Sequence, residues 1–210
     1  MQLQQLLQQG LVWQGQQQQR HDQQQFVDSG WVELNQNLGG GWLRGSVNEL
    51  QVAQPFSGEL ALLVPLLRQL QRPILWINPP AQPYLPGLLH QQIEHSPLLV
   101  RTHSQQHALW ALEQAIQSRQ FGVLLAWLPE LSAAWVRRLQ QAAEQHQQLV
   151  FIITAWQHTD EARAYVTRLQ LQRGADSFQV GIKKRRFGWP LAPFVCPIDQ
   201  LLPTRRRLVS

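Results

Sequence analysis

The stretch VNELQVAQPFSGELALLVPLLRQL, residues 47–70, combines three local patterns that decide the fold. Residues 47–52 alternate and are typical of a β-strand. Residues 53–58 contain Pro and Gly and predict a loop. Residues 59–70 are apolar enough for a buried helix, in which Pro65 introduces a kink or limits the first turns. A strand, a short Gly-containing loop and a helix therefore follow one another directly.

The same alternation of strand and helix continues downstream. Apolar runs predict strands at 74–77, 98–100, 123–128 and 149–154, and helical spacing predicts helices at 84–93, 104–119 and 132–146. Residues 168–172 and 178–182 alternate around a turn and predict an antiparallel hairpin. Continuous apolar strands indicate a sheet covered on both faces. The predicted fold class is α/β, with a mostly parallel sheet flanked by helices and a late β-hairpin.

The loop at 53–58 occupies the place of a phosphate-binding loop but has lost its chemistry. A P-loop needs a Lys for the terminal phosphates and a hydroxyl for magnesium after its second Gly. Here Gly58 is followed by Glu59 and Leu60, and the loop itself contains Pro55 and Ser57. A carboxylate repels triphosphate, and Leu cannot ligate magnesium. We expect this degenerate loop not to bind ATP.

A second acidic site is missing as well. The strand that precedes the Mg²⁺-binding carboxylate of such proteins is apolar and ends in Asp. Residues 123–128 supply the apolar run, but Trp127 and Pro129 stand where the carboxylate is needed. These two losses predict no ATP hydrolysis, no enzymatic activity and no cofactor. The hypothesis that these losses disfavour most is a residual ATPase activity.

Composition sets further limits on function. The chain has 210 residues, of which 44% are hydrophobic and 15% charged, enough for one well-buried domain. A single Cys excludes an intramolecular disulfide framework and a Cys-based zinc site. The sequence carries no secretory signal pattern and no apolar run long enough for a membrane span, so we expect a cytoplasmic protein.

The net charge of +5 is concentrated near the C-terminus. Two basic clusters are expected to contact a polyanion or an acidic partner, although a solvated basic tail is the simpler alternative. They consist of Lys183, Lys184, Arg185 and Arg186, and of Arg205, Arg206 and Arg207. Adjacent cations contact phosphates without reading bases, so DNA binding here is expected to be salt-sensitive and non-specific.

Two of the nine Trp residues are further contact candidates. Trp42 follows a Gly triplet and Trp189 follows the first basic cluster. Such aromatic side chains either stack on single-stranded bases or anchor a protein interface, unless they pack in the core. Of the His residues, His103 and His107 have a spacing that suits a metal only with further ligands, and these are missing. No metal site is predicted.

Several stretches together resemble the RecA-related SulA/ImuA group. Residues 38–50 (LGGGWLRGSVNEL) resemble the lead-in to the nucleotide loop of RecA recombinases, and residues 57–67 (SGELALLVPLL) resemble the group itself. Further matching stretches are WINPP (76–80), YLP (84–86), ALWALEQA (108–115), VLLAWLP (123–129) and IKKRR (182–186). The resemblance covers roughly residues 35–190 and is closer to the ImuA branch, which carries the Gly lead-in and the basic C-terminal segment.

This resemblance implies a RecA-like core without ATPase activity that serves SOS-induced translesion DNA synthesis. The implied partners are an ImuB-like homologue of Y-family polymerases and an error-prone replicative-type polymerase, with RecA as a further candidate. The alternative is a SulA-like inhibitor that binds FtsZ and blocks its polymerisation. The expected organisation is a Gln-rich leader and linker at 1–30, a RecA-like domain at 31–187 and a basic Pro-containing tail at 188–210. Leucine spacing at residues 3–11 predicts a short helix, either a spacer or a partner-binding element.

Overall fold

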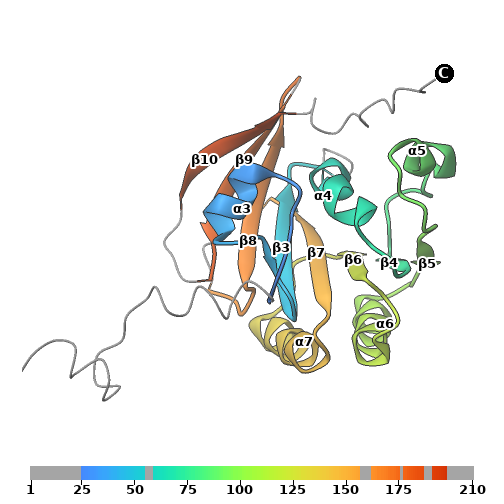
Figure 1. Ribbon diagram of the computed structural model, residues 1–210. Coiled ribbons are helices and arrows are strands. Elements are labelled where there is room, and N and C mark those ends of the chain that lie inside the picture. The colour runs from blue at the N-terminus through green and yellow to red at the C-terminus, as the bar shows by residue number, and fades with distance from the viewer. Residues whose placement is uncertain (1–24, 55–58, 157–161, 176, 187–190, 198–210) are drawn as a thin grey trace, which may run out of the picture.

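The computed structural model describes residues 25–54, 59–156, 162–175, 177–186 and 191–197. A sheet of eight strands forms the centre, in the order β10-β9-β8-β3-β7-β6-β4-β5 (Figure 1). Six neighbouring strands, from β8 to β5, are paired in parallel, whereas β9 and β10 are antiparallel. The predicted fold class is therefore confirmed, including the late hairpin of β8 and β9.

The parallel strands are short and apolar, as the sequence predicts. They are β3 (Ser46–Val52), β4 (Ile74–Ile77), β5 (Leu98–Val100), β6 (Val123–Trp127), β7 (Leu149–Ala155) and β8 (Thr167–Arg173). All residues of β3, β4 and β6 are buried. Burial on both faces explains why β4, β6 and β7 are continuous apolar runs, whereas β3 and β8 alternate in sequence.

Helices cover the two faces of the sheet. Leu50 and Val52 of β3 join a core cluster with α4 (Glu59–Arg68) and α3 (Val32–Leu38), whereas Val47 joins the cluster of α6 (Gln105–Ser118) and α7 (Ala133–His146). The side chains of Ser104 and Ser132 cap α6 and α7 by accepting backbone N–H groups. The fifth helix, α5 (Leu85–His90), has no buried residue and lies beside β5 (Figure 1).

The segment before β3 is more ordered than its sequence indicates. β1 (Phe26–Val27) pairs antiparallel with β2 (Trp42–Leu43), and α3 lies between them along the chain. The indole of Trp31 donates to the carbonyl of Leu62 at 2.8 Å, which fixes the start of α3 on α4. Gly30 has φ +78°, and a Cβ there would approach Cβ of Pro65 to 2.1 Å, so only Gly fits.

The C-terminal part of the sheet also extends beyond the expected elements. β9 (Ser177–Lys184) pairs with β10 (Leu191–Pro197), so residues assigned to the tail by sequence form an edge strand. Pro193 and Pro197 obscure this strand in the sequence, although Pro is tolerated at a sheet edge. Residues 1–24 and 198–210 lie outside the described residues, and with them the predicted helix at 3–11.

Candidate functional site

The loop between β3 and α4 begins at the carboxyl end of the central strand, the edge where ligands bind in open α/β sheets. β3 ends at Val52, and α4 begins at Glu59. Pro55, Ser57 and Gly58 lie outside the described residues. Glu59 itself is fully buried, and the indole Nε1 of Trp127 donates a hydrogen bond to its Oε1 at 3.1 Å.

This contact joins the two positions at which the sequence predicts that the residues of an ATPase are missing. The prediction puts Glu59 at the Lys position of the loop and Trp127 at the end of the apolar strand that would precede the acidic residue. Trp127 also packs edge-on against Trp76, with ring centroids 5.4 Å apart. The Glu59 carboxylate is thus held inside the protein, and it adds negative charge where a nucleotide would need a cation.

A buried ionic cluster lies on the other face of β3. The carboxylate of Glu49 accepts from Nε of Arg168 at 2.6 Å, from Nε2 of Gln51 at 3.0 Å and from the hydroxyl of Thr154 at 3.4 Å. These three partners come from β8, β3 and β7. Because both charges are almost fully buried, each needs the other. The carboxylate is tied up in this way and is poorly placed to act as a general base.

A second ion pair lies next to this cluster. Arg163, which is buried, forms a salt bridge with Glu130, and Tyr165 lies near both pairs. Burial, followed by the charge of Glu49, raises the pKa of the Tyr165 phenol well above its usual value. The phenol stays protonated at neutral pH. Sequence analysis missed this cluster, and its one signal was a Glu inside an apolar strand.

The side chains of the basic run at the end of β9 make different contacts. Lys184 donates to the carbonyl of Arg163 at 2.5 Å, whereas Arg185 donates to the carbonyl of Asn37 in the last turn of α3 at 2.7 Å. Lys183 and Arg186 are exposed. The four residues predicted as one contact surface are therefore not equivalent, because Arg185 binds the body of the protein.

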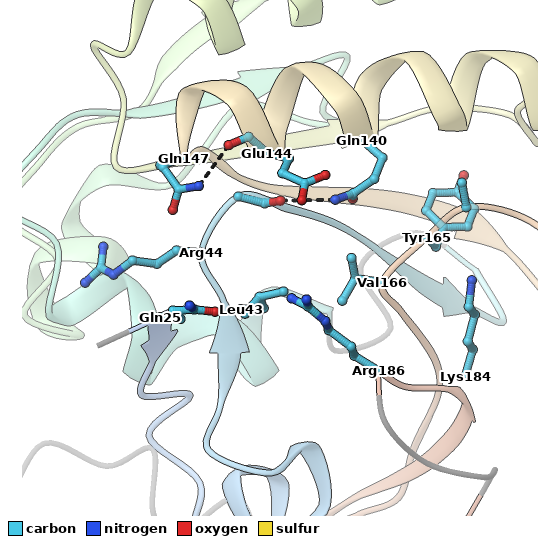
Figure 2. A pocket seen from close by; sticks show the side chains of 12 residues that line it. Gln25, Leu43, Arg44, Gln140, Glu144, Gln147, Tyr165, Val166, Lys184 and Arg186 are labelled. Atoms are coloured by element: carbon cyan, nitrogen blue, oxygen red, sulfur yellow. Dashed lines mark hydrogen bonds between the residues drawn. The ribbon is translucent and has the colours of Figure 1, made fainter. Parts of the chain in front are cut away.

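A pocket of about 570 Å³ lies beside this run, at the amino ends of the parallel strands. Figure 2 shows Lys184 and Arg186 reaching into it from the end of β9, opposite Gln140 and Glu144 of α7. The pocket lies at the edge of the sheet opposite the loop between β3 and α4. Sequence reasoning did not find it, since its walls come from segments far apart in the chain.

Trp42 corrects the prediction of a surface contact. Its side chain is 1% exposed and packs edge-on against Phe151, with ring centroids 4.8 Å apart. The Gly triplet forms a turn that brings the indole into the core, so Trp42 is a packing residue. Trp189, Arg205, Arg206 and Arg207 lie outside the described residues, and their contact roles stay predictions.

The remaining candidates for chemistry are structural or scattered. Cys196 is buried in the core, and burial raises the pKa of its thiol to about 12. Over the described ranges, no three His, Cys, Asp or Glu side chains come together as a metal site. Within the same ranges, no helix is long and apolar enough to cross a membrane.

Comparison with known proteins relates the chain to two kinds of protein. The cell division inhibitor SulA of Edwardsiella piscicida is 39% identical over 87 residues, which make up 40% of this chain and 52% of the relative. The chain thus spans about half the length of the curated relative it matches. The crystal structure of the RadB recombinase has a TM-score of 0.63 and 14% identity, covering 84% of this chain and 98% of RadB. No family model matches the sequence.

These findings give the fold a RecA-like identity. The structural match spans nearly all of a recombinase, and the helix-covered parallel sheet agrees with it. At 14% identity this likeness concerns the fold alone. The sequence match adds a partial relationship to a division inhibitor and so links the RecA-like fold with the SulA side of the resemblance.

Proposed function

We propose that this protein is a non-catalytic accessory protein of SOS-induced translesion DNA synthesis. It binds polymerase components, an ImuB-like homologue and an error-prone replicative-type polymerase, and holds them together. In this role the RecA-like core supplies a rigid surface rather than a nucleotide-driven motor.

The hydrogen bond between Trp127 and Glu59 carries the non-catalytic part of this proposal. It fills the carboxyl edge of the sheet with a buried carboxylate and two packed indoles. Phosphate binding at that edge needs the opposite charge and free backbone donors. A protein with this arrangement acts by binding partner proteins and not by hydrolysing a nucleotide.

The polymerase part of the proposal rests on the sequence resemblance to the ImuA branch, which covers roughly residues 35–190. The segment from β8 to β10 adds two antiparallel strands, and the basic run lies between them, at the end of β9. We assign partner contact to the exposed members of this run, Lys183 and Arg186.

A second candidate function follows from the sequence match to SulA. Under it, the protein binds FtsZ and stops its polymerisation, with no requirement for the basic run. The 39% identity over 87 residues favours this candidate. The two candidates share a non-enzymatic RecA-like core and differ in their partner.

A capture experiment with purified full-length protein separates the two. The immobilised chain is offered the ImuB-like homologue and FtsZ from the same bacterium, each alone. The proposal predicts retention of the polymerase homologue. Retention of FtsZ alone would contradict it and support the inhibitor.

Point variants locate the contact better than a truncation. Removing residues from 183 onward would delete β10 and the bond of Arg185 to α3, and so would damage the fold. The double variant Lys183→Ala/Arg186→Ala removes two exposed charges instead. Arg137→Ala is the matched control, since Arg137 is exposed on α7. We expect the double variant alone to weaken capture of the polymerase homologue.

A further inference from the structure

The pocket at the amino ends of the strands contains Arg186, which the proposed function uses, and further charged side chains that it does not use. Three cationic side chains line it, Arg44, Lys184 and Arg186, together with one carboxylate, Glu144. Its lining therefore carries a net charge of about +2 at neutral pH. A concave site with excess positive charge concentrates anions.

The cations come from two separate parts of the chain. Arg44 directly follows β2, whereas Lys184 is the last residue of β9 and Arg186 lies two residues beyond it. Within the described part of the chain, the Arg44 guanidinium has no carboxylate partner. Lys184 is half-buried, and burial together with the charge of Arg168 lowers its pKa. An anion in the pocket would relieve this repulsion.

The opposite wall comes from the last turns of α7 and offers directional groups. The Gln140 amide binds the protein itself, because it donates to the Gly45 carbonyl at 3.1 Å and accepts from the Val47 N–H at 2.8 Å. These bonds fix α7 against the start of β3. The Gln147 amide donates to the carbonyl of Glu144, which leaves its own oxygen as an acceptor facing the pocket (Figure 2).

The Glu144 carboxylate limits the ligand further. A purely anionic ligand would be repelled by it, whereas a ligand that carries both an anion and N–H donors satisfies both walls. A nucleotide has this combination, since its phosphate is anionic and its base edge carries N–H groups. The volume of about 570 Å³ lies in the range of small-molecule sites.

We infer that this pocket binds one nucleotide unit, with its phosphate between Lys184 and Arg186 and its base edge toward Glu144. The unit comes either from single-stranded DNA or from a free mononucleotide. The site is distinct from the loop between β3 and α4 and lies at the other edge of the sheet. This inference does not depend on which protein partner the chain captures, so the two can fail separately.

The test is a binding titration with full-length protein. A fluorescein-labelled single strand of mixed sequence is followed by anisotropy, and unlabelled dGMP and inorganic phosphate serve as competitors. Arg186→Ala is expected to weaken binding by about tenfold, because a charge-assisted contact to the phosphate is lost. Arg44→Ala is expected to weaken binding by a smaller factor, because it removes one positive charge of the lining. Both residues are exposed, so these variants should fold.

The controls separate the pocket from the other basic residues. Arg137→Ala removes an exposed charge of α7 outside the pocket lining, and Arg205→Ala/Arg206→Ala/Arg207→Ala removes the terminal cluster. Both are expected to keep the affinity within about twofold. Loss of binding in the terminal variant, with Arg186→Ala unchanged, would overturn the inference.

Competition identifies the source of the nucleotide and the role of the carboxylate. If dGMP displaces the labelled strand at concentrations at which dGMP itself binds the protein, the ligand of the pocket is a free nucleotide. If only unlabelled DNA displaces it, the ligand is a nucleotide of single-stranded DNA. Glu144→Gln is expected to let inorganic phosphate compete better, since a repulsive charge is gone. Binding of a poly-glutamate peptide with no binding of either nucleotide form would overturn the inference in favour of an acidic partner.

Discussion

At the residue scale, the most demanding interaction is the ion pair between Glu49 and Arg168. Both charges lie between the strands and α7, and both are almost fully removed from water. A buried pair adds little net stability compared with a well-packed apolar pair, but losing one partner leaves the other charge unpaired. The contribution of the ion pair can therefore be measured by comparing a single variant with a double variant.

Replacement of Glu49 alone is expected to destabilise the protein strongly. Glu49→Leu leaves the Arg168 guanidinium buried without its charge partner, which costs about 3–5 kcal/mol of unfolding free energy. The double variant Glu49→Leu/Arg168→Met is expected to recover most of that loss. Urea denaturation followed by circular dichroism measures both. An unfolding free energy of Glu49→Leu that lies within about 1 kcal/mol of the wild-type value, which is roughly the error of such fits, would show that the pair is solvated.

The stability of the protein is expected to fall at alkaline pH because of Cys196 and Tyr165. Burial raises the pKa of the Cys196 thiol from 9.0 to about 12, and it raises that of Tyr165 from 10.0. A raised folded-state pKa gives a contribution that is complete below the unfolded value and is lost as the pH rises towards the folded value. The loss from the thiol begins near pH 9 and is at most about 1.4 kcal/mol per pH unit.

The variant Cys196→Ala tests this source. It removes the thiol titration and is expected to flatten the fall in unfolding free energy between pH 9 and pH 10, before Tyr165 contributes. Lys184 acts in the opposite direction, because its lowered pKa favours stability as the pH rises towards 10.5. An unchanged slope in Cys196→Ala would assign the alkaline loss to other groups.

For single residues, sequence reasoning showed which ATP-binding residues are missing, but not which contacts the residues in their place make. It identified Glu59 and Trp127 as residues that cannot serve ATP, yet it could not see that they bind each other across 68 positions. It named Trp42 as a contact candidate because a Gly triplet precedes it, with packing in the core as the alternative, and the indole lies in the core. Contacts between residues far apart in the chain leave no local pattern to read.

At the element scale, the late strands tie the N-terminal helix to the sheet. β10 contacts α3, and the guanidinium of Arg185 reaches the carbonyl of Asn37 near the end of that helix. The carbonyls at a helix C-terminus lack partners within the helix, so a cation there both donates to them and matches the helix dipole. Gly39, with φ +78°, completes the same end.

Removal of this contact is expected to loosen α3. Arg185→Ala should cost about 1 kcal/mol of unfolding free energy, whereas the neighbouring Lys183→Ala should change it by less than about 0.5 kcal/mol because Lys183 is exposed. Thermal unfolding of the two variants makes the comparison. Equal effects of both substitutions would mean that the run acts by overall charge.

The elements themselves were largely predictable. Apolar runs located β4 to β7, and alternation located β3. Helical spacing located α6 and α7, and an apolar stretch located α4. The apolar runs were visible because strands of a sheet covered on both faces are apolar along their whole length. α3 was missed because its N-cap is Trp31, which makes no side-chain cap hydrogen bond. β10 was missed because its two Pro residues argue against a strand unless the strand lies at an edge.

At the scale of the whole molecule, the sheet has different chemistry at the two ends of its parallel strands. Its carboxyl edge, where RecA-like proteins are expected to bind nucleotide, holds the buried Glu59 and two packed indoles. Its amino edge holds an open cationic pocket. The fold class could be read from the sequence, but the amino-edge pocket could not, since β2, α7 and β9 meet there only in three dimensions.

The central claim is that this RecA-like fold acts without ATP. Its most direct test is a calorimetric titration of the full-length protein with ATP and magnesium, at the carboxyl edge that Glu59 closes. The variant Arg186→Ala is titrated in parallel, so that any heat from the amino-edge pocket is recognised and subtracted. We predict that any binding of ATP is weakened by Arg186→Ala and that no phosphate is released. Binding that is unchanged in Arg186→Ala, together with phosphate release, would contradict the account and place the chain among the nucleotide-driven members of its fold.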